Sequence, residues 1–159
     1  MPVEMKVKGL MIDPVSQMPI IVLKKPDDET VLPIWVGLFE ANAIAMQLEN
    51  IVSPRPMTHD LICSVIDALR ATVDRVEITD LRDNTFFALI HLDRAGEKLA
   101  IDARPSDAMA LALRVRVPIF VAESVLQKSI QGDEEKGDET ERLRRWLEQV
   151  DPEDLGKPM

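Results

Sequence analysis

Residues 101–114 read Ile-Asp-Ala-Arg-Pro-Ser-Asp-Ala-Met-Ala-Leu-Ala-Leu-Arg. This stretch has the pattern of a strand end, a tight turn and a short helix that is too apolar to lie on a surface. Pro105 suits the first helical turn, because a proline has no N–H to leave unpaired there. The charged residues around the apolar run are Asp102, Arg104, Asp107 and Arg114. Charges beside a buried helix must be paired, hydrated or functional, so any account of the chain has to explain these four.

The composition predicts one globular, soluble domain with an appendage, because 159 residues are 46% hydrophobic and 30% charged. No apolar run approaches the roughly 20 residues of a membrane span. The first ten residues alternate apolar and charged side chains, unlike a secretory signal. The single cysteine, Cys63, excludes an internal disulfide. We therefore expect a cytoplasmic protein with no membrane partner.

The charge balance bears on the choice of partner. The formal net charge is -9, whereas tight nonspecific binding to nucleic acid needs a basic surface. Aromatic residues make up 4% of the chain and tyrosine is absent, which leaves few side chains on which bases can stack. Nucleic acid, if it is a partner, is expected to bind weakly.

The N-terminal third predicts three antiparallel strands. Apolar residues alternate with other residues from Val3 to Met11, and further extended segments run over 19–23 and 31–36. Pro33 cannot donate to a strand ladder, so the third strand is expected at a sheet edge or at a bulge. Short turns between these segments favour a meander.

The middle of the chain predicts two helices followed by a second meander. Gly37 opens a helix that runs to about Asn50, and Thr58 is the expected N-cap of the next. The second helix is expected to bury one apolar stripe, namely Leu61, Ile62, Val65, Ile66 and Leu69. Strands are predicted over 73–81, 85–92 and 98–101, a short extended segment over 117–121, and a helix over 123–130.

Together these elements predict an α+β fold, with a mainly antiparallel sheet of two meanders flanked by helices and a C-terminal helical extension. The domain is expected to span residues 1–130. Residues 131–138 have the composition of an acidic linker. Residues 139–159 are expected to form a C-terminal amphipathic helix and tail, with Leu143, Trp146, Leu147 and Val150 on one helical face.

Two Arg-Pro pairs stand immediately before predicted helix starts, Arg55-Pro56 and Arg104-Pro105. Each places an arginine near the free N–H groups of a helix N-terminus, which is the makeup of an anion site. Two such helix starts form one shared site if the fold brings them together.

The candidate site is a set of charged residues at helix starts, strand ends and the loop between two helices. Its candidate catalytic residues are His59, Asp60, Asp102 and Asp107; its candidate phosphate ligands are Arg55, Arg104 and Arg114; its candidate metal ligands are Glu40, Asp102 and Asp107. Carboxylates are the ligands that Mg²⁺ or Mn²⁺ prefers, and a histidine can activate water. No organic cofactor is expected, because the six glycines form no phosphate-binding loop.

Structural readings compete with each of these assignments. The same charges can form a salt-bridge network at helix starts, which is common in proteins. His59 and Cys63 are four residues apart and offer half of a zinc site, but the chain has no second pair, so Cys63 is better explained as a half-buried thiol. His91, on a predicted strand, is interpreted as a packed histidine.

Three blocks of sequence resemble the bifunctional nuclease domain family. They are Leu-Pro-Ile-Trp-Val-Gly at 32–37 with Glu40-Ala41, Arg-Pro-Met-Thr-His-Asp-Leu at 55–61, and Asp-Ala-Arg-Pro-Ser-Asp-Ala at 102–108 with 111–114 and Pro118-Ile119. The resemblance implies an α+β fold, self-association into a homo-oligomer, and nuclease activity on DNA and RNA. The first hypothesis is a metal-assisted phosphodiesterase. Its rival is a non-enzymatic oligomeric module that binds a small anion or a protein partner.

Overall fold

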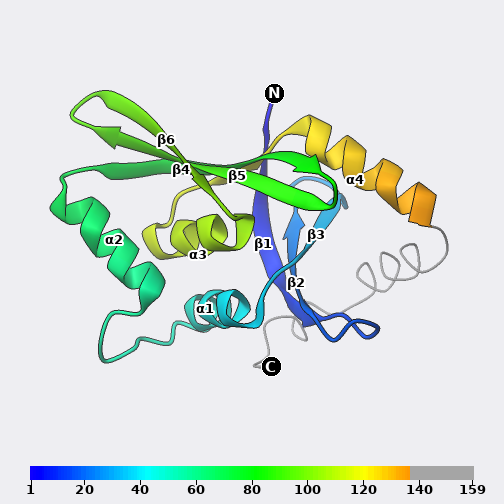
Figure 1. Ribbon diagram of the computed structural model, residues 1–159, viewed down its shortest axis with the longest axis horizontal. Helices are drawn as coiled ribbons and strands as arrows, with labels where there is room; N and C mark the ends of the chain where they lie inside the picture. Colours follow the sequence, from blue (N-terminus) through cyan, green and yellow to red (C-terminus); the bar gives the residue numbers. More distant parts are fainter. Residues whose placement is uncertain (137–159) are drawn as a thin grey trace.

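The fold is built on one seven-stranded sheet in the order β3-β2-β1-β7-β4-β5-β6. The computed structural model describes residues 1–136, with side chains to residue 130. The strands are β1 (Val3–Ile12), β2 (Pro19–Lys24), β3 (Val31–Trp35), β4 (Thr72–Arg82), β5 (Thr85–Arg94), β6 (Glu97–Ala103) and β7 (Ile119–Val121). The helices are α1 (Leu38–Leu48), α2 (Thr58–Ala68), α3 (Pro105–Val115) and α4 (Glu123–Lys136). Figure 1 shows their arrangement.

Both predicted meanders are present. β1, β2 and β3 pair antiparallel in sequence order, as do β4, β5 and β6. Pro33 lies on β3, opposite Val22 of β2. Because β3 is an edge strand of the sheet, the N–H that Pro33 lacks costs no ladder bond to a further strand. The short β7 joins the meanders, antiparallel to β1 and parallel to β4. The predicted α+β class with a mainly antiparallel sheet is confirmed.

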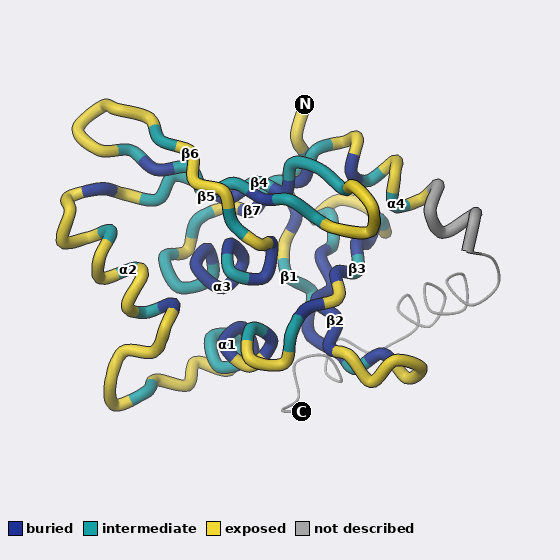
Figure 2. Tube along the Cα trace, in the orientation of Figure 1, coloured by how far each residue is buried: buried dark blue, intermediate teal, exposed yellow. Residues whose placement is uncertain are grey.

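Helix α3 lies at the centre of the helical layer. It packs on β4 and β5 on one side and contacts both α1 and α2 on the other. Residues 105–106 and 108–112 are all buried, and Figure 2 shows this helix as the darkest of the four. The apolar run over residues 105–113 is therefore a core helix, as its composition predicted.

Helix α2 corrects two sequence predictions. Its N-cap is Met57, and Thr58 is the first helical residue. The stripe predicted to be buried is mostly exposed to solvent, because α2 contacts the body of the domain through α3 and buries only His59 fully. Figure 2 shows α2 as largely exposed along its length. Helical periodicity correctly placed these apolar residues on one face of the helix, but the prediction that the protein buries this face was wrong.

The C-terminal boundary also differs from the prediction. Helix α4 continues to Lys136, through most of the segment expected to be a linker over 131–138. A long helix tolerates acidic residues in water, so their composition alone did not mark its end. The predicted amphipathic helix over 139–150 and the rest of the tail to 159 lie outside the described residues. None of the described helices has the length and apolar character required to cross a bilayer.

Candidate functional site

The start of α3 is the first part of the site. Arg104 is the N-cap, with extended backbone angles, and Pro105 follows as the first helical residue. Asp107 lies in the first turn, where a carboxylate is favoured by the helix dipole. The Arg104 Nε–H donates to Asp107 Oδ2 over 2.8 Å. Within the Arg-Pro-x-Asp sequence, the aspartate therefore binds the arginine three residues before it and holds that side chain at the helix start.

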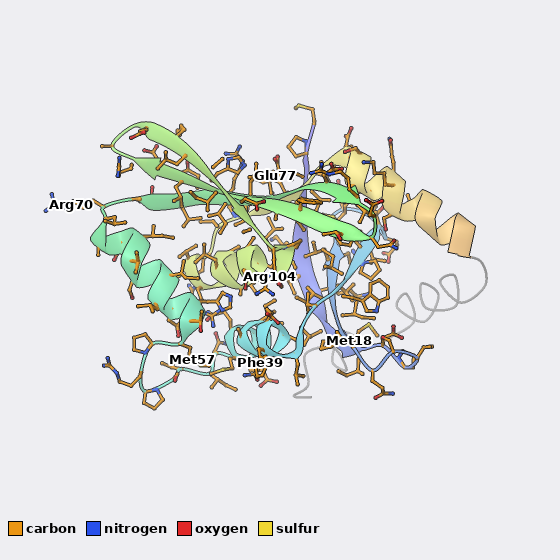
Figure 3. The ribbon with its side chains drawn as sticks, viewed as in Figure 1. Met18, Phe39, Met57, Arg70, Glu77 and Arg104 are labelled. Atoms are coloured by element: carbon orange, nitrogen blue, oxygen red, sulfur yellow. The ribbon has the colours of Figure 1, made fainter. Side chains whose placement is uncertain are left out.

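Glu40, in the first turn of α1, reaches the same arginine. Its Oε1 lies 2.9 Å from Arg104 Nη2. The Arg104 side chain remains 64% exposed, although it is held by two carboxylates. Figure 3 places Arg104 between α3 and α1. The starts of α1 and α3 thus converge on a guanidinium that still faces water.

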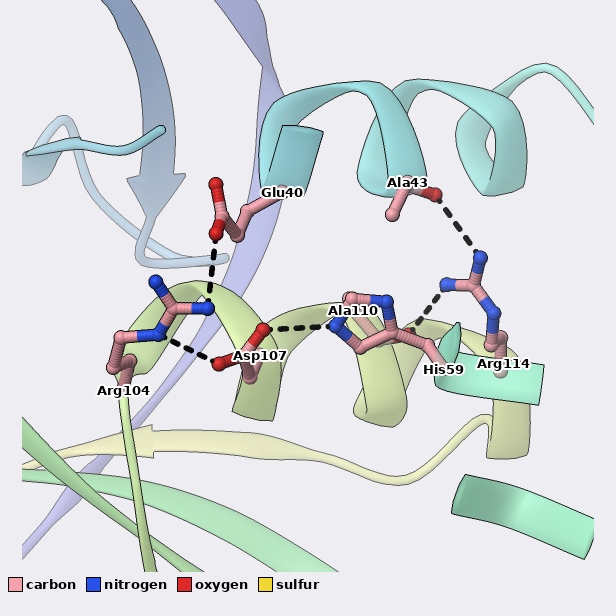
Figure 4. A network of polar contacts seen from close by, with 7 residues as sticks. All are labelled: Glu40, Ala43, His59, Arg104, Asp107, Ala110 and Arg114. Atoms are coloured by element: carbon pink, nitrogen blue, oxygen red, sulfur yellow. Dashed lines mark hydrogen bonds and ion pairs between the residues drawn. The ribbon is translucent and has the colours of Figure 1, made fainter. Parts of the chain in front are cut away.

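His59 joins these residues from α2. Its Nε2 lies 2.9 Å from Asp107 Oδ1, and its side chain is buried. Asp107 therefore binds the histidine with one oxygen and the arginine with the other, as Figure 4 shows. The other ring nitrogen, Nδ1, makes no hydrogen bond to any residue that the structure describes. A carboxylate that fixes one imidazole nitrogen and leaves the other available is the arrangement of a general base.

The charges keep Asp107 ionised. Partial burial alone raises the pKa of Asp107, but its hydrogen bonds to Arg104 and His59 outweigh that effect and hold the pKa below its usual value. Asp107, and then Glu40, in turn raise the pKa of the Arg104 guanidinium. The site therefore contains a fixed negative charge between a permanent positive charge and a histidine.

Asp60 and Arg114 form a second, more structural pair. Arg114 Nε donates to Asp60 Oδ1 over 2.8 Å, and its other nitrogens donate to Ala110 O at 3.0 Å and Ala43 O at 3.3 Å. Arg114 is 8% exposed, so these acceptors replace water. The backbone N–H of Met57 donates to Asp60 Oδ2 over 3.1 Å and, with Arg114, lowers the pKa of Asp60. Arg114 thereby ties α1, α2 and α3 together. Figure 4 shows its bonds to Ala43 of α1 and Ala110 of α3.

Two predicted site residues remain apart from this network. Arg55 is exposed on the loop between α1 and α2, and no hydrogen bond or ion pair joins it to the described residues. Asp102 is exposed on β6, opposite Leu89. The predicted convergence of the two Arg-Pro pairs is therefore only partial, since His59 and Asp60 reach α3 but Arg55 does not.

The carboxylates face arginines more than one another. Within residues 1–130, which contain every predicted metal ligand, no group of three or more His, Cys, Asp or Glu side chains is placed to hold a metal ion. Glu40 and Asp107 both bind Arg104, while Asp102 lies elsewhere. As arranged here, the residues do not fit a Mg²⁺ or Mn²⁺ site.

The family model described as the bifunctional nuclease domain matches residues 21–133. The chain belongs to the bifunctional nuclease domain family. The matched region of this bifunctional nuclease domain contains all three sequence blocks and every residue of the network, so the resemblance read from those blocks is confirmed.

Relatives of this bifunctional nuclease domain protein fall into two groups. An uncharacterized protein of Mycobacterium tuberculosis (strain H37Rv) is 38% identical over 162 residues, which is 96% of this chain and 97% of the relative. Bifunctional nuclease 1 of Oryza sativa subsp. japonica and Bifunctional nuclease 2 of Arabidopsis thaliana are each 31% identical over 105 residues. That region is 64% of this chain and 32% of each plant protein.

Sequence reasoning missed the backbone part of this bifunctional nuclease domain site. The carbonyl oxygens of Ala43 and Ala110 accept from Arg114, but alanine side chains carry no sign of that role. A nearly buried arginine at the end of an apolar helix was the available signal, because its donors must find acceptors inside the protein.

Proposed function

We propose that this chain is a nuclease that hydrolyses phosphodiester bonds of DNA, RNA or both. The observation that carries the proposal is the bond between His59 Nε2 and Asp107 Oδ1, beside an exposed arginine. Membership of the bifunctional nuclease domain family supports the same reaction, as do the names of the plant relatives.

In the proposed reaction His59 is the general base. With Asp107 accepting the Nε2–H, the Nδ1 lone pair takes a proton from a water molecule. The resulting hydroxide attacks phosphorus and the bond from phosphorus to the leaving oxygen breaks. That oxygen takes a proton from solvent, and protonated His59 afterwards returns its proton to solvent. The positive charge that forms on His59 is stabilised by the ionised Asp107.

Arg104 is the proposed phosphate ligand. Its guanidinium is exposed and adjoins Asp107, so a phosphate bound there lies near the base. Arg55 is proposed as a second phosphate contact from the neighbouring loop, because it has no partner among the described residues and lies four residues before His59. Asp60 and Arg114 are positioning residues in this proposal, since their bonds fix the start of α2. Asp102 and an assisting Mg²⁺ or Mn²⁺ stay predictions that the assay below examines.

The test is hydrolysis of labelled single- and double-stranded DNA and RNA by the purified full chain. We expect His59→Gln and Asp107→Asn each to lower the rate by about 10²–10⁴-fold. His91→Gln is the matched control, because His91 is the other histidine of the chain and lies on β5 outside the network. Activity that survives both site substitutions contradicts the proposal.

Two further arms of the assay address the open residues. Reactions with EDTA, Mg²⁺ or Mn²⁺ separate metal-assisted from metal-independent hydrolysis, and Asp102→Asn tests the exposed carboxylate on β6. If EDTA abolishes cleavage and Asp102→Asn does the same, the carboxylates rearrange around a metal in the active state. If neither changes the rate, the reaction needs neither a metal ion nor Asp102.

A second candidate function is a non-enzymatic module that binds a small anion or a protein partner. The mutual pairing of Glu40, Asp107 and Arg104 favours it, because paired charges need no substrate to satisfy them. This alternative predicts phosphate binding at Arg104 without hydrolysis. Calorimetric titration with inorganic phosphate, together with the nuclease assay, distinguishes the two functions: binding with no cleavage under any metal condition supports the module.

A further inference from the structure

Helix α2 presents large aliphatic side chains to solvent. Leu61 is 57% exposed, Ile62 37%, Val65 50% and Leu69, at the C-cap, 62%. Single exposed aliphatic residues are ordinary on protein surfaces, but a contiguous group on one helix is not. The group therefore requires an explanation beyond the folding of one domain.

These residues share one side of the helix. At 3.6 residues per turn, the exposed residues Thr58, Leu61, Ile62, Val65, Ala68 and Leu69 lie within an arc of about 120°, here named the outer face of α2. None of the six is charged, although 30% of the chain is. Asp60 and Asp67 lie on the opposite side of the helix.

The domain does not use the outer face for its own packing. Helix α2 meets the rest of the domain through α3, by the side that carries His59 and Asp60. The outer face lies opposite that side of the helix, and Figure 2 shows α2 at one edge of the domain and largely exposed. Among the residues that the structure describes, none covers the apolar stripe, which is thus available to another molecule.

We propose that the outer face of α2 binds the same face of a second copy of this chain. Leu61, Val65 and Leu69 are spaced four residues apart, so the stripe is symmetric about Val65. In an antiparallel pair of helices related by a two-fold axis, Val65 meets Val65, and Leu61 of one copy meets Leu69 of the other. Such an isologous contact is the commonest way in which identical chains associate.

The exposed area favours a second copy as the partner. Each chain carries a net charge of -9, so two copies repel over most of their surface, and an uncharged face is where they meet with least repulsion. Given whole-residue areas of roughly 150–200 Å², the exposed fractions of the four aliphatic residues amount to a few hundred Å², a large part of the core of a standard interface of about 800 Å² per partner. This inference does not depend on the proposed nuclease activity.

The test is the mass of the full chain in solution, by light scattering and sedimentation between about 1 and 100 µM. We expect a dimer that Val65→Asp dissociates, with Kd raised by at least about 100-fold. Phe39→Asp is the matched control, because Phe39 is also a large, exposed apolar residue but lies on α1, away from the outer face of α2. Both positions are exposed, so both variants should fold, and circular dichroism checks this.

A second measurement locates the contact directly. In a Cys63→Ser background, Val65→Cys should form a disulfide between two copies under mild oxidation, because residue 65 lies on the proposed axis. The proposal is overturned if the wild-type chain is monomeric over the whole concentration range, and binding of a different protein to the outer face would not rescue it. It is also overturned if Val65→Asp assembles like the wild type, or if Phe39→Asp is the variant that dissociates.

Discussion

Asp107 Oδ1 lies 2.9 Å from Nε2 of His59, a residue 48 positions earlier in the chain. The other oxygen of the same carboxylate accepts from Arg104 over 2.8 Å. One aspartate therefore connects the start of α3 to the start of α2 and orients both the candidate base and the candidate phosphate ligand. The behaviour of the site depends on this residue more than on any other in the network.

Replacing Asp107 by asparagine should separate its chemical role from its packing. The amide keeps the shape of the carboxylate but loses its charge, so the imidazole is no longer stabilised as a cation. We expect a free energy of unfolding lower by about 1–3 kcal/mol, measured by urea denaturation, besides the loss of hydrolysis. Glu77→Gln is the control, because Glu77 Oε2 lies 3.9 Å from His91 Nε2 in a looser pair on the sheet. Equal losses in both variants would contradict a special role for Asp107.

The pH dependence of the free energy of unfolding should reflect the ionisation of Asp107 and Asp60. Asp107 and Asp60 both have a pKa below the ordinary value of 3.8. A carboxyl group whose pKa is lower in the folded state stabilises the fold above its unfolded pKa, and this contribution disappears as the pH falls through the folded pKa. We expect the free energy of unfolding to decline below about pH 5, and Asp60→Asn and Asp107→Asn each to make that decline shallower.

Chemical denaturation at a series of pH values between about 3 and 6 measures this effect. Asp102→Asn serves as the reference, since Asp102 is exposed on β6 and outside the network. A decline that is as steep in the two site variants as in the Asp102 variant would show that other groups control acid unfolding.

Arg114 should be more important for stability than for binding. Replacing it by methionine leaves Asp60, Ala43 O and Ala110 O without the donor that satisfies them. We expect a loss of about 2–4 kcal/mol in the free energy of unfolding, below the full cost of breaking a buried pair because Asp60 keeps contact with water. Arg70→Met is the control: Figure 3 shows Arg70 at the far end of α2, pointing into solvent, and a change within about 0.5 kcal/mol is expected there. A small effect at Arg114 would mean that water replaces its bonds.

The fold could largely be predicted from the sequence because its strands have clear alternation and short turns. Pro33 correctly indicated an edge strand, and the composition of 105–113 correctly indicated a core helix. The failures share a cause: periodicity gives the direction of an apolar stripe on α2 but not whether a neighbour in the same chain covers it. That depends on tertiary contacts.

The sequence indicated only in part which charged residues lie together. His59, Arg104 and Asp107 come together as expected, since charged residues at helix starts converge where helices pack. The sequence could not show that Arg55 remains apart or that Glu40 turns to Arg104, because both depend on how α1 is placed beside α3. Charged residues within a few positions of one another in sequence can face different neighbours in the fold.

Gly37 offers a way to move Glu40 without changing it. A Cβ on Gly37 would meet Glu40 Oε2, the end of a flexible side chain, so the carboxylate rather than the backbone should shift. Gly37 has ordinary extended backbone angles, and we expect Gly37→Ala to change the free energy of unfolding by no more than about 1 kcal/mol. The contact of 2.9 Å between Glu40 and Arg104 should nevertheless be weakened.

If Arg104 holds the scissile phosphate, a guanidinium that loses one of its two anchors should lower kcat/KM by about tenfold. Gly37→Ala and Glu40→Gln should then have similar effects, and the double variant should be no worse than either, because both remove one interaction. Asn42→Ala, at an exposed position of the same helix, should leave kcat/KM unchanged. Additive losses in the double variant would mean that Gly37 acts on the site by a route other than Glu40.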